Sequence, residues 1–355
     1  MHTLIGVIFH FIGGFASGSF YLPYKKVRGW AWESYWIIGG LFSWLIIPLV
    51  AASLTVPNFM EIIRGTDGNV IFWTYFMGVL WGIGGLTFGL AMRYLGLSLG
   101  MSIALGLTSA FGSLIPPIYR DLFTTETKDS FSGMLHSTGG LVVLLGVVVC
   151  LFGIFICGKA GTMKEKELSQ EQKTASILEF NLSKGIIVAV ISGTLSACFN
   201  FGIEAGKPMA AVAIESGSNP LFQNNVIFVV LLWGGLTTNL IWCMILNTRN
   251  KTFRDYTDKR TPLARNYIFA ALAGTTWFLQ FFFYGMGESK LGNGASSWIL
   301  HMAFIILISN MWGITLNEWK GVSRKTYGTI GAGIVIILVS VLLVGLGNYL
   351  SNPVG

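Results

Sequence analysis

Charged residues are scarce in this chain: they make up 11% of its 355 positions, against about 25% in a typical soluble domain. All sixteen acidic residues lie in short polar stretches or near the ends of apolar segments. The four cysteines, at positions 150, 157, 198 and 243, lie inside apolar segments without zinc spacing or a disulfide pattern. The scarcity of charge argues against a soluble domain, and we interpret the cysteines as small packing residues.

The features of an enzyme are also missing. No polar stretch exceeds about 26 residues, and no apolar segment carries paired carboxylates, a metal-binding cluster or a phosphate-binding loop. We therefore expect neither catalysis nor a cofactor. The first segment lacks a charged leader and a small-residue cleavage site, so we expect residues 1–22 to remain as a membrane span.

Long apolar runs dominate the sequence, and apolar residues fill 53% of it. A helix needs roughly 20 such residues to cross the hydrocarbon core of a bilayer. Spanning β-strands would alternate with period two, and these runs are apolar on all faces. Ten spans are predicted, at 3–22, 35–54, 70–91, 97–118, 137–158, 185–205, 224–247, 267–287, 294–316 and 326–350.

Basic residues fall mainly on one side of these spans. With the N-terminus outside, eighteen of the 23 Lys and Arg residues lie in inner loops and five in outer loops. Positive charge stays cytoplasmic, so both termini are predicted to lie outside. The net charge of +7 is spread over five short inner loops, which indicates topology rather than a nucleic-acid site.

The sequence also contains a weak internal repeat. Gly14 realigns on Gly193 at an offset of 179, and Gly78 realigns on Gly274 at an offset of 196. The predicted units are residues 1–158 and 185–355, each with five spans, joined by a cytoplasmic linker at 159–184. Because five is odd, the second unit enters the membrane from the opposite face, as in the inverted repeats of secondary transporters.

A few polar residues lie inside the spans. His10, Gln280 and His301 each lie about seven residues from the outer end of their helix, or roughly 10 Å deep. Asn200 is slightly nearer the outside. Polar groups inside a membrane are costly and usually face the bundle interior. We expect a polar substrate pocket here; the alternative is that these side chains only cross-link helices.

Neighbours at helical spacing add hydroxyl and aromatic groups to this pocket. Polar groups for hydroxyls and aromatic faces for C–H stacking suit a small sugar. The full predicted set is His10, Ser17, Tyr21, Trp81, Asn200, Trp277, Gln280, Tyr284, Ser297 and His301. The two tryptophans are repeat partners, and symmetric packing is an equal alternative for them.

Histidine is suited to carrying a coupling proton, because its unperturbed pKa is near 6.5. His10 and His301 are the candidates. Glu204 is a further candidate, although its neighbour Lys207 makes a simple surface ion pair an alternative.

Several long motifs resemble the bacterial L-rhamnose–proton symporter family. They are the segment from His10 to Glu33 containing FYLPYKKVRGWAWE, then WGIGGLTFGLAMRYLGLSLG, Gly206–Met209, WFLQFFFYGMG and SSWILHM. The resemblance covers essentially the whole chain. It implies ten helices of the drug/metabolite transporter superfamily and proton-driven uptake of L-rhamnose or a similar deoxysugar across the inner membrane. Glu204 and residues 288–295 depart from the family pattern.

The resemblance also places part of the predicted pocket on family motifs, namely His10, Trp81, Trp277, Gln280, Ser297 and His301. The combined hypothesis is a sugar–proton symporter with alternating access, whose partners are a small sugar, a proton and membrane lipid. An exporter or exchanger of another metabolite on the same fold is one alternative, and a sugar sensor without transport is another.

Overall fold

The computed structural model describes residues 2–123, 130–167, 182–315, 319 and 321–351, and within these ranges the regular structure is entirely helical. The elements are α1 (His2–Ser19), α2 (Tyr21–Tyr24), α3 (Trp32–Leu41), the π-helical turn η1 (Phe42–Ile46), α4 (Ile47–Thr55), α5 (Phe59–Gly65), α6 (Gly68–Phe123), α7 (Phe131–Leu135), α8 (Thr138–Glu167), α10 (Leu182–Glu215), the 3₁₀ turn η2 (Pro220–Phe222), α11 (Asn225–Asn250), the 3₁₀ turn η3 (Phe253–Tyr256), α12 (Leu263–Leu291), α13 (Gly294–Thr315) and α14 (Arg324–Ser351).

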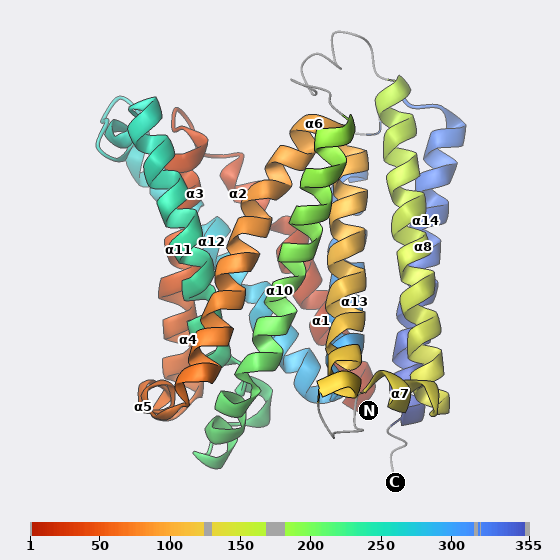
Figure 1. Cartoon of the computed structure of the whole chain (residues 1–355). Coiled ribbons are helices and arrows are strands. Elements are labelled where there is room, and N and C mark those ends of the chain that lie inside the picture. Colours follow the sequence, from red (N-terminus) through yellow and green to blue (C-terminus); the bar gives the residue numbers. More distant parts are fainter. Residues whose placement is uncertain (1, 124–129, 168–181, 316–318, 320, 352–355) are drawn as a thin grey trace.

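Nine stretches in the described part of the chain are long and apolar enough to cross a membrane. They agree with nine of the ten predicted spans, which supports an integral membrane protein. The remaining prediction, 97–118, lies within α6, a helix of 56 residues. Figure 1 shows α6 crossing the bundle, bending at one end and returning beside α10.

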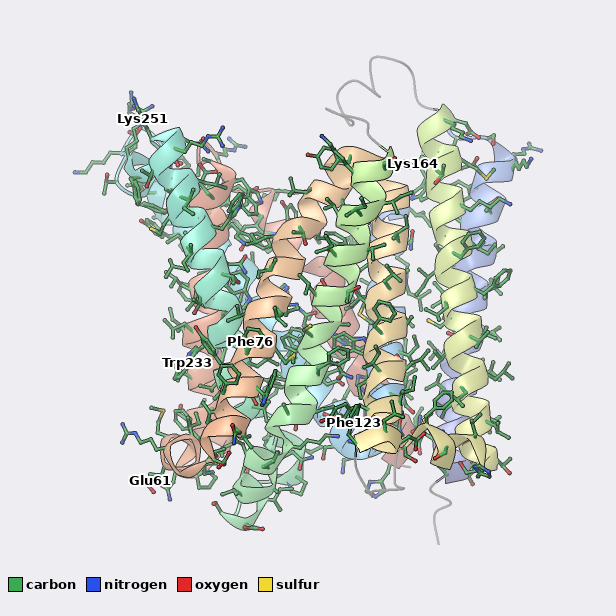
Figure 2. All side chains as sticks on the ribbon, viewed as in Figure 1. Glu61, Phe76, Phe123, Lys164, Trp233 and Lys251 are labelled. Carbon is green, nitrogen blue, oxygen red and sulfur yellow. The ribbon has the colours of Figure 1, made fainter. Side chains whose placement is uncertain are left out.

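The long helices form a bundle in which α10 packs along α6, α14 packs along α8, and α1 lies against α12 and α13 (Figure 1). Lys164 and Lys251 lie at one end of this bundle, and Glu61 and Phe123 lie at the other (Figure 2). Helix α1 begins, and α14 ends, at the end where Glu61 lies.

Some of the glycines are needed for close helix contacts. A Cβ at Gly14 would collide with Phe304 of α13, and one at Gly78 would collide with the carbonyl oxygen of Leu231 in α11. By contrast, Gly85 and Gly89 of α6 have no other atom within 4 Å of the place a Cβ would take. Gly78 therefore marks a close helix contact, whereas Gly85 and Gly89 do not.

Three prolines lie inside long helices rather than at their ends. Pro208 lies inside α10, and Pro116 and Pro117 lie inside α6. One missing N–H costs a single helical hydrogen bond. After Pro208, the side chains of Met209 and Ala213 are fully buried in a cluster with α11, and this packing outweighs the loss.

Two further expectations concern loops and cysteines. Helix α8 continues to Glu167, so the first part of the expected linker at 159–184 is helical, and residues 168–181 lie outside the described ranges. All four cysteines are free and buried, as expected of packing residues.

Candidate functional site

Two histidines from different helices meet in the middle of the bundle. His10 of α1 and His301 of α13 are 0% and 1% exposed, and their ring centroids are 6.3 Å apart. The ring of Tyr284 from α12 stands edge-on to both, with 5.3 Å between centroids in each case. Gln280 lies one turn before Tyr284 on α12, and Ser297 one turn before His301 on α13. We call these five residues the histidine cluster.

Glycines make room for the histidine cluster. A Cβ at Gly287 would lie 2.6 Å from Nε2 of His10, and one at Gly13 would lie 2.8 Å from the carbonyl oxygen of Gln280. Both distances are too short for non-bonded atoms. These glycines thus bring α1 close to α12, and the Cβ position of Gly13 also lies 3.5 Å from the ring of His301 on α13.

The polar atoms of this cluster are mostly without partners. Among the described residues, neither ring nitrogen of His10 or His301 has a hydrogen-bond partner, and the same holds for Nε2 of Gln280 and Oγ of Ser297. More than nine in ten buried polar groups in proteins are hydrogen-bonded, and each exception costs about 1–3 kcal/mol. Six such atoms in one place are the property expected of a site that binds a polar ligand.

Asn200 has a different role. Its Nδ2 donates a hydrogen bond to the carbonyl oxygen of Gly112 at 2.8 Å, and its Oδ1 accepts one from the Tyr284 hydroxyl at 3.1 Å. The amide joins α10 to α6 and α12, which is the kind of contact that the helix cross-linking alternative expects. Through Tyr284 it also fixes a ring of the histidine cluster.

The predicted tryptophans form a second group beside the histidine cluster. Trp81 and Trp277 have centroids 5.5 Å apart, and the ring of Trp44 stands edge-on to them at 6.2 and 5.9 Å. We call these three residues the indole cluster. Phe281 links the groups, since its ring is 5.1 Å from Trp277 and 5.9 Å from His301. Trp44 was not predicted, because spacing on one helix does not reveal contacts between helices.

Two predicted residues are placed elsewhere. Tyr21 follows the end of α1, is 42% exposed, and its ring contacts Phe20 and Tyr24 rather than the histidine cluster. Ser17 is partly exposed and lies about two turns along α1 from His10.

Glu204 belongs to a group of charged residues at the end of the bundle where Phe123 lies. Its carboxylate accepts a hydrogen bond from Arg120 and pairs with Nζ of Lys207 at 2.7 Å. Nζ of Lys207 also lies 3.8 Å from Glu288, whose other oxygen accepts a hydrogen bond from Asn224 at 2.5 Å. We call these five residues the Glu204 network.

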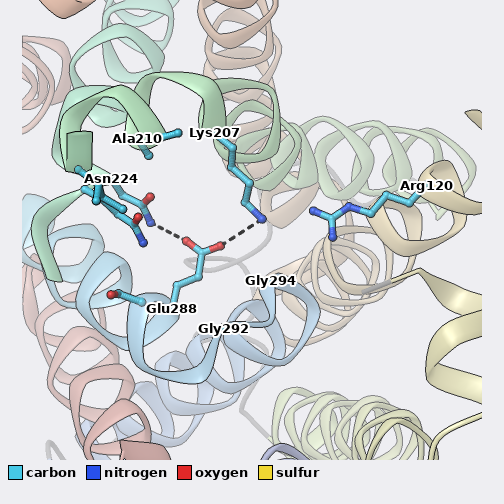
Figure 3. A pocket seen from close by; sticks show the side chains of 11 residues that line it. Arg120, Lys207, Ala210, Asn224, Glu288, Gly292 and Gly294 are labelled. Carbon is cyan, nitrogen blue, oxygen red and sulfur yellow. Dashed lines mark hydrogen bonds and ion pairs between the residues drawn. The ribbon is translucent and has the colours of Figure 1, made fainter. Parts of the chain in front are cut away.

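Four members of this network line a pocket of about 380 Å³ (Figure 3). The i,i+3 spacing predicted the Glu204–Lys207 pair, but Arg120 and Glu288 come from distant helices. The network joins the ends of α6, α10 and α12, so it can hold this end of the bundle together.

The fold defines a polytopic helical membrane protein, and its bundle encloses a group of buried polar atoms that lack partners among the described residues. Residues 2–349 match the family of the L-rhamnose-proton symport protein, RhaT, and the chain belongs to this family.

Three relatives illustrate the match, each called L-rhamnose-proton symporter. The Cronobacter sakazakii protein is 36% identical over 348 residues, covering 97% of both chains. The Klebsiella pneumoniae protein is 35% identical with the same coverage, and the Yersinia pestis protein is 37% identical over 349 residues, covering 97% of this chain and 98% of its own.

Proposed function

We propose that the protein is a multi-pass transporter of the bacterial inner membrane that couples uptake of L-rhamnose, or a closely related deoxysugar, to proton entry. The description of the family names the sugar and the proton. The observation that carries the proposal for this chain is the pair of buried histidines whose four ring nitrogens have no partner among the described residues.

The proposed sugar site is the histidine cluster, with Trp81 and Trp277 beside it. Hydroxyl groups of a sugar both donate and accept hydrogen bonds, so they can satisfy imidazole, amide and serine atoms together. Asn200 supports the site through Tyr284. Ser17 and Tyr21 also belong to the proposed set. A sugar would contact them only on its way to or from the histidine cluster.

We assign proton coupling to His10 and His301 ahead of Glu204. A neutral imidazole that gains a proton changes from one donor and one acceptor to two donors, which alters how it binds a hydroxyl. The carboxylate of Glu204 already has two cationic partners, Arg120 and Lys207.

The proposed architecture has ten spans, with residues 1–158 and 185–355 as inverted repeats and both termini outside. Paired glycine contacts support it. Gly14 of α1 packs on α13, while its repeat partner Gly193 of α10 packs on Ala104 in the returning limb of α6. Likewise, Gly78 packs on α11, while its partner Gly274 of α12 packs on Gly39 of α3. The two units use equivalent contacts.

Alternating access then requires the two ends to open in turn. The Glu204 network closes the end that the charge distribution assigns to the outside. In the proposed cycle, sugar and proton enter at this end while the network is parted, and rocking of the two units exposes the histidine cluster to the cytoplasm.

Uptake of labelled L-rhamnose into proteoliposomes tests this function. We expect accumulation with an inward proton gradient, no accumulation after the gradient is collapsed, and competition by related deoxysugars. Transport that ignores the gradient would contradict coupling and favour an exchanger. Binding of the sugar without any flux would favour a sensor.

A further inference from the structure

Trp44 is held by an irregular turn inside the membrane. Residues 42–46 form the π-helical turn η1, in which the Ile47 N–H bonds to the carbonyl oxygen of Phe42. Pro48 has no N–H to offer the carbonyl of Trp44, so a regular helix cannot continue here. Single π turns within helices occur frequently at functional sites. The π turn gives the indole of Trp44 a direction that it would not have on a regular helix.

Glycines on two helices make space for the indole cluster. A Cβ at Gly40 would collide with the six-membered ring of Trp44, and a Cβ at Gly235 would collide with that of Trp81. Both rings therefore pack against bare backbone. A larger residue at either position would displace the ring, so the chain itself defines where the three indoles stand.

The indole N–H of Trp44 is buried among its neighbours. The side chain is 4% exposed, and Nε1 has no hydrogen-bond partner among the described residues. Other indoles nearby are satisfied: Trp36 donates to Asn239 at 3.0 Å, and Trp298 donates to the carbonyl oxygen of Thr108 at 3.0 Å. A weak contact of this N–H with the face of a neighbouring ring is the competing explanation.

The position of Trp44 connects it to the proposed sugar site. Trp277 lies one turn of α12 before Gln280, on the side of the end marked by Lys251. Phe281 separates the two clusters by a single ring. A sugar that leaves the histidine cluster toward that end meets the indole cluster next.

We propose that the indole cluster is a second sugar-contacting station and that Nε1 of Trp44 donates a hydrogen bond to one hydroxyl of the sugar. This inference rests on the proposed function. Indole faces stack on the C–H groups of a pyranose, and the single N–H distinguishes sugars by the position of one oxygen. Trp44 is thus a specificity-determining residue.

Binding measurements on the purified protein in lipid nanodiscs test the hydrogen bond. The ligands are L-rhamnose and four analogues, each lacking one hydroxyl. For W44F we expect about tenfold weaker binding of L-rhamnose, the loss typical of one hydrogen bond to a buried group. For one analogue, wild type and W44F should bind equally, because that sugar cannot accept the bond.

W233F is the matched control. Trp233 of α11 also has an Nε1 without a partner among the described residues, and within the same residues its ring is not among those that contact Trp44, Trp81 or Trp277. This variant should bind all five sugars as wild type does. If W44F does not fold, 3-benzothienylalanine at position 44 keeps the ring shape and replaces the N–H with sulfur.

Two results would overturn the inference while leaving the proposed function intact: unchanged binding of L-rhamnose by W44F, or an equal loss for every analogue, which would indicate packing only. A wild-type protein that neither binds nor accumulates any of these sugars would overturn the proposed function, and this inference with it.

Discussion

At the scale of single residues, the two buried histidines are unusual because nothing in the described chain satisfies them. Trp298 and Asn200 are also buried, and both have hydrogen-bond partners. A histidine kept for helix packing would be expected to have one as well. The energetic cost of burying His10 and His301 is explained if their partner is the transported molecule.

His301→Ala should abolish gradient-driven accumulation of the sugar and leave a folded protein. The substitution removes both ring nitrogens from the proposed site. Uptake into proteoliposomes and the thermal midpoint in detergent are the measurements. His136→Ala is the control, because His136 is exposed and its ring hydrogen-bonds to the carbonyl oxygen of Ser132, one turn away. Normal uptake by the His301 variant would disprove its role.

The sequence could indicate which polar residues of the spans are buried, and it could not predict contacts between helices. Counting from the ends of spans selected His10, Gln280 and His301, and all three are buried. Helical spacing added Tyr21, which is exposed and whose ring contacts Phe20 and Tyr24. Trp44 was not predicted, because its position depends on a π turn. The neighbouring ring of Trp81 packs against Gly235, which belongs to another helix.

At the scale of elements, the glycine seams set how closely helices approach. Gly78→Ala should destabilise the protein by about 1–3 kcal/mol, because the new methyl group collides with the backbone of Leu231 in α11. Gly85→Ala lies on the same helix with open space, so it should be neutral or slightly stabilising. The measurement is the thermal unfolding midpoint of both variants in detergent. Equal midpoints would contradict a close helix contact at Gly78.

The junction of α8 and α14 should depend on pH. Hydrogen bonds from Thr326, and from the N–H and hydroxyl of Ser323, hold the pKa of Glu167 below its ordinary value of 4.5. A lowered folded pKa adds stability above the unfolded pKa, and this is lost as pH falls through the folded pKa.

Glu167→Gln should therefore lower the unfolding midpoint at pH 7, and the difference from wild type should shrink below about pH 4. Unfolding curves recorded over that range in detergent are the measurement. Glu61→Gln, which changes an exposed acid at the opposite end, serves as control. A difference that stays constant with pH would contradict the capping role.

The length of the apolar runs was enough to predict that these segments are helices. It did not predict the residues at which the helices begin and end. Pro208 shows why: it removes one helical hydrogen bond, but α10 continues past it because Met209 is buried against α11. Pro48 behaved differently: it lies in the first turn of α4, directly after the π turn.

At the scale of the whole molecule, the Glu204 network should control access from one side. Glu288→Gln removes a charge that faces Lys207. We expect roughly tenfold faster labelling of a cysteine placed at Ser297 by an impermeant reagent applied at the Glu61 end, since removing the buried charge of Glu288 from its pair with the more exposed Lys207 shifts the opening equilibrium.

Asp258→Asn is the matched control for this experiment. Its pair with Arg260 is largely exposed, and exposed pairs contribute at most about 1 kcal/mol. Labelling in this background should equal that of the Ser297 variant alone. Equal labelling with Glu288→Gln as well would show that the network does not close this end.

The overall arrangement was predictable only in part. The offsets of 179 and 196 pair Gly14 with Gly193 and Gly78 with Gly274, and each of these four glycines packs closely on another helix. The inverted repeat and the orientation of the termini stay predictions. The Glu204 network was not predictable, since Arg120 and Glu288 are 168 positions apart in the chain and meet only after the bundle forms.

Helix α6 has a consequence for how the chain enters the bilayer. It turns back at the end of the bundle while remaining helical, and the turn region contains a single basic residue, Arg93. One charge and no polar loop give the insertion machinery little to anchor between the two limbs. We therefore expect residues 68–123 to leave the translocon together as one hairpin, so the pair is a single unit of biogenesis.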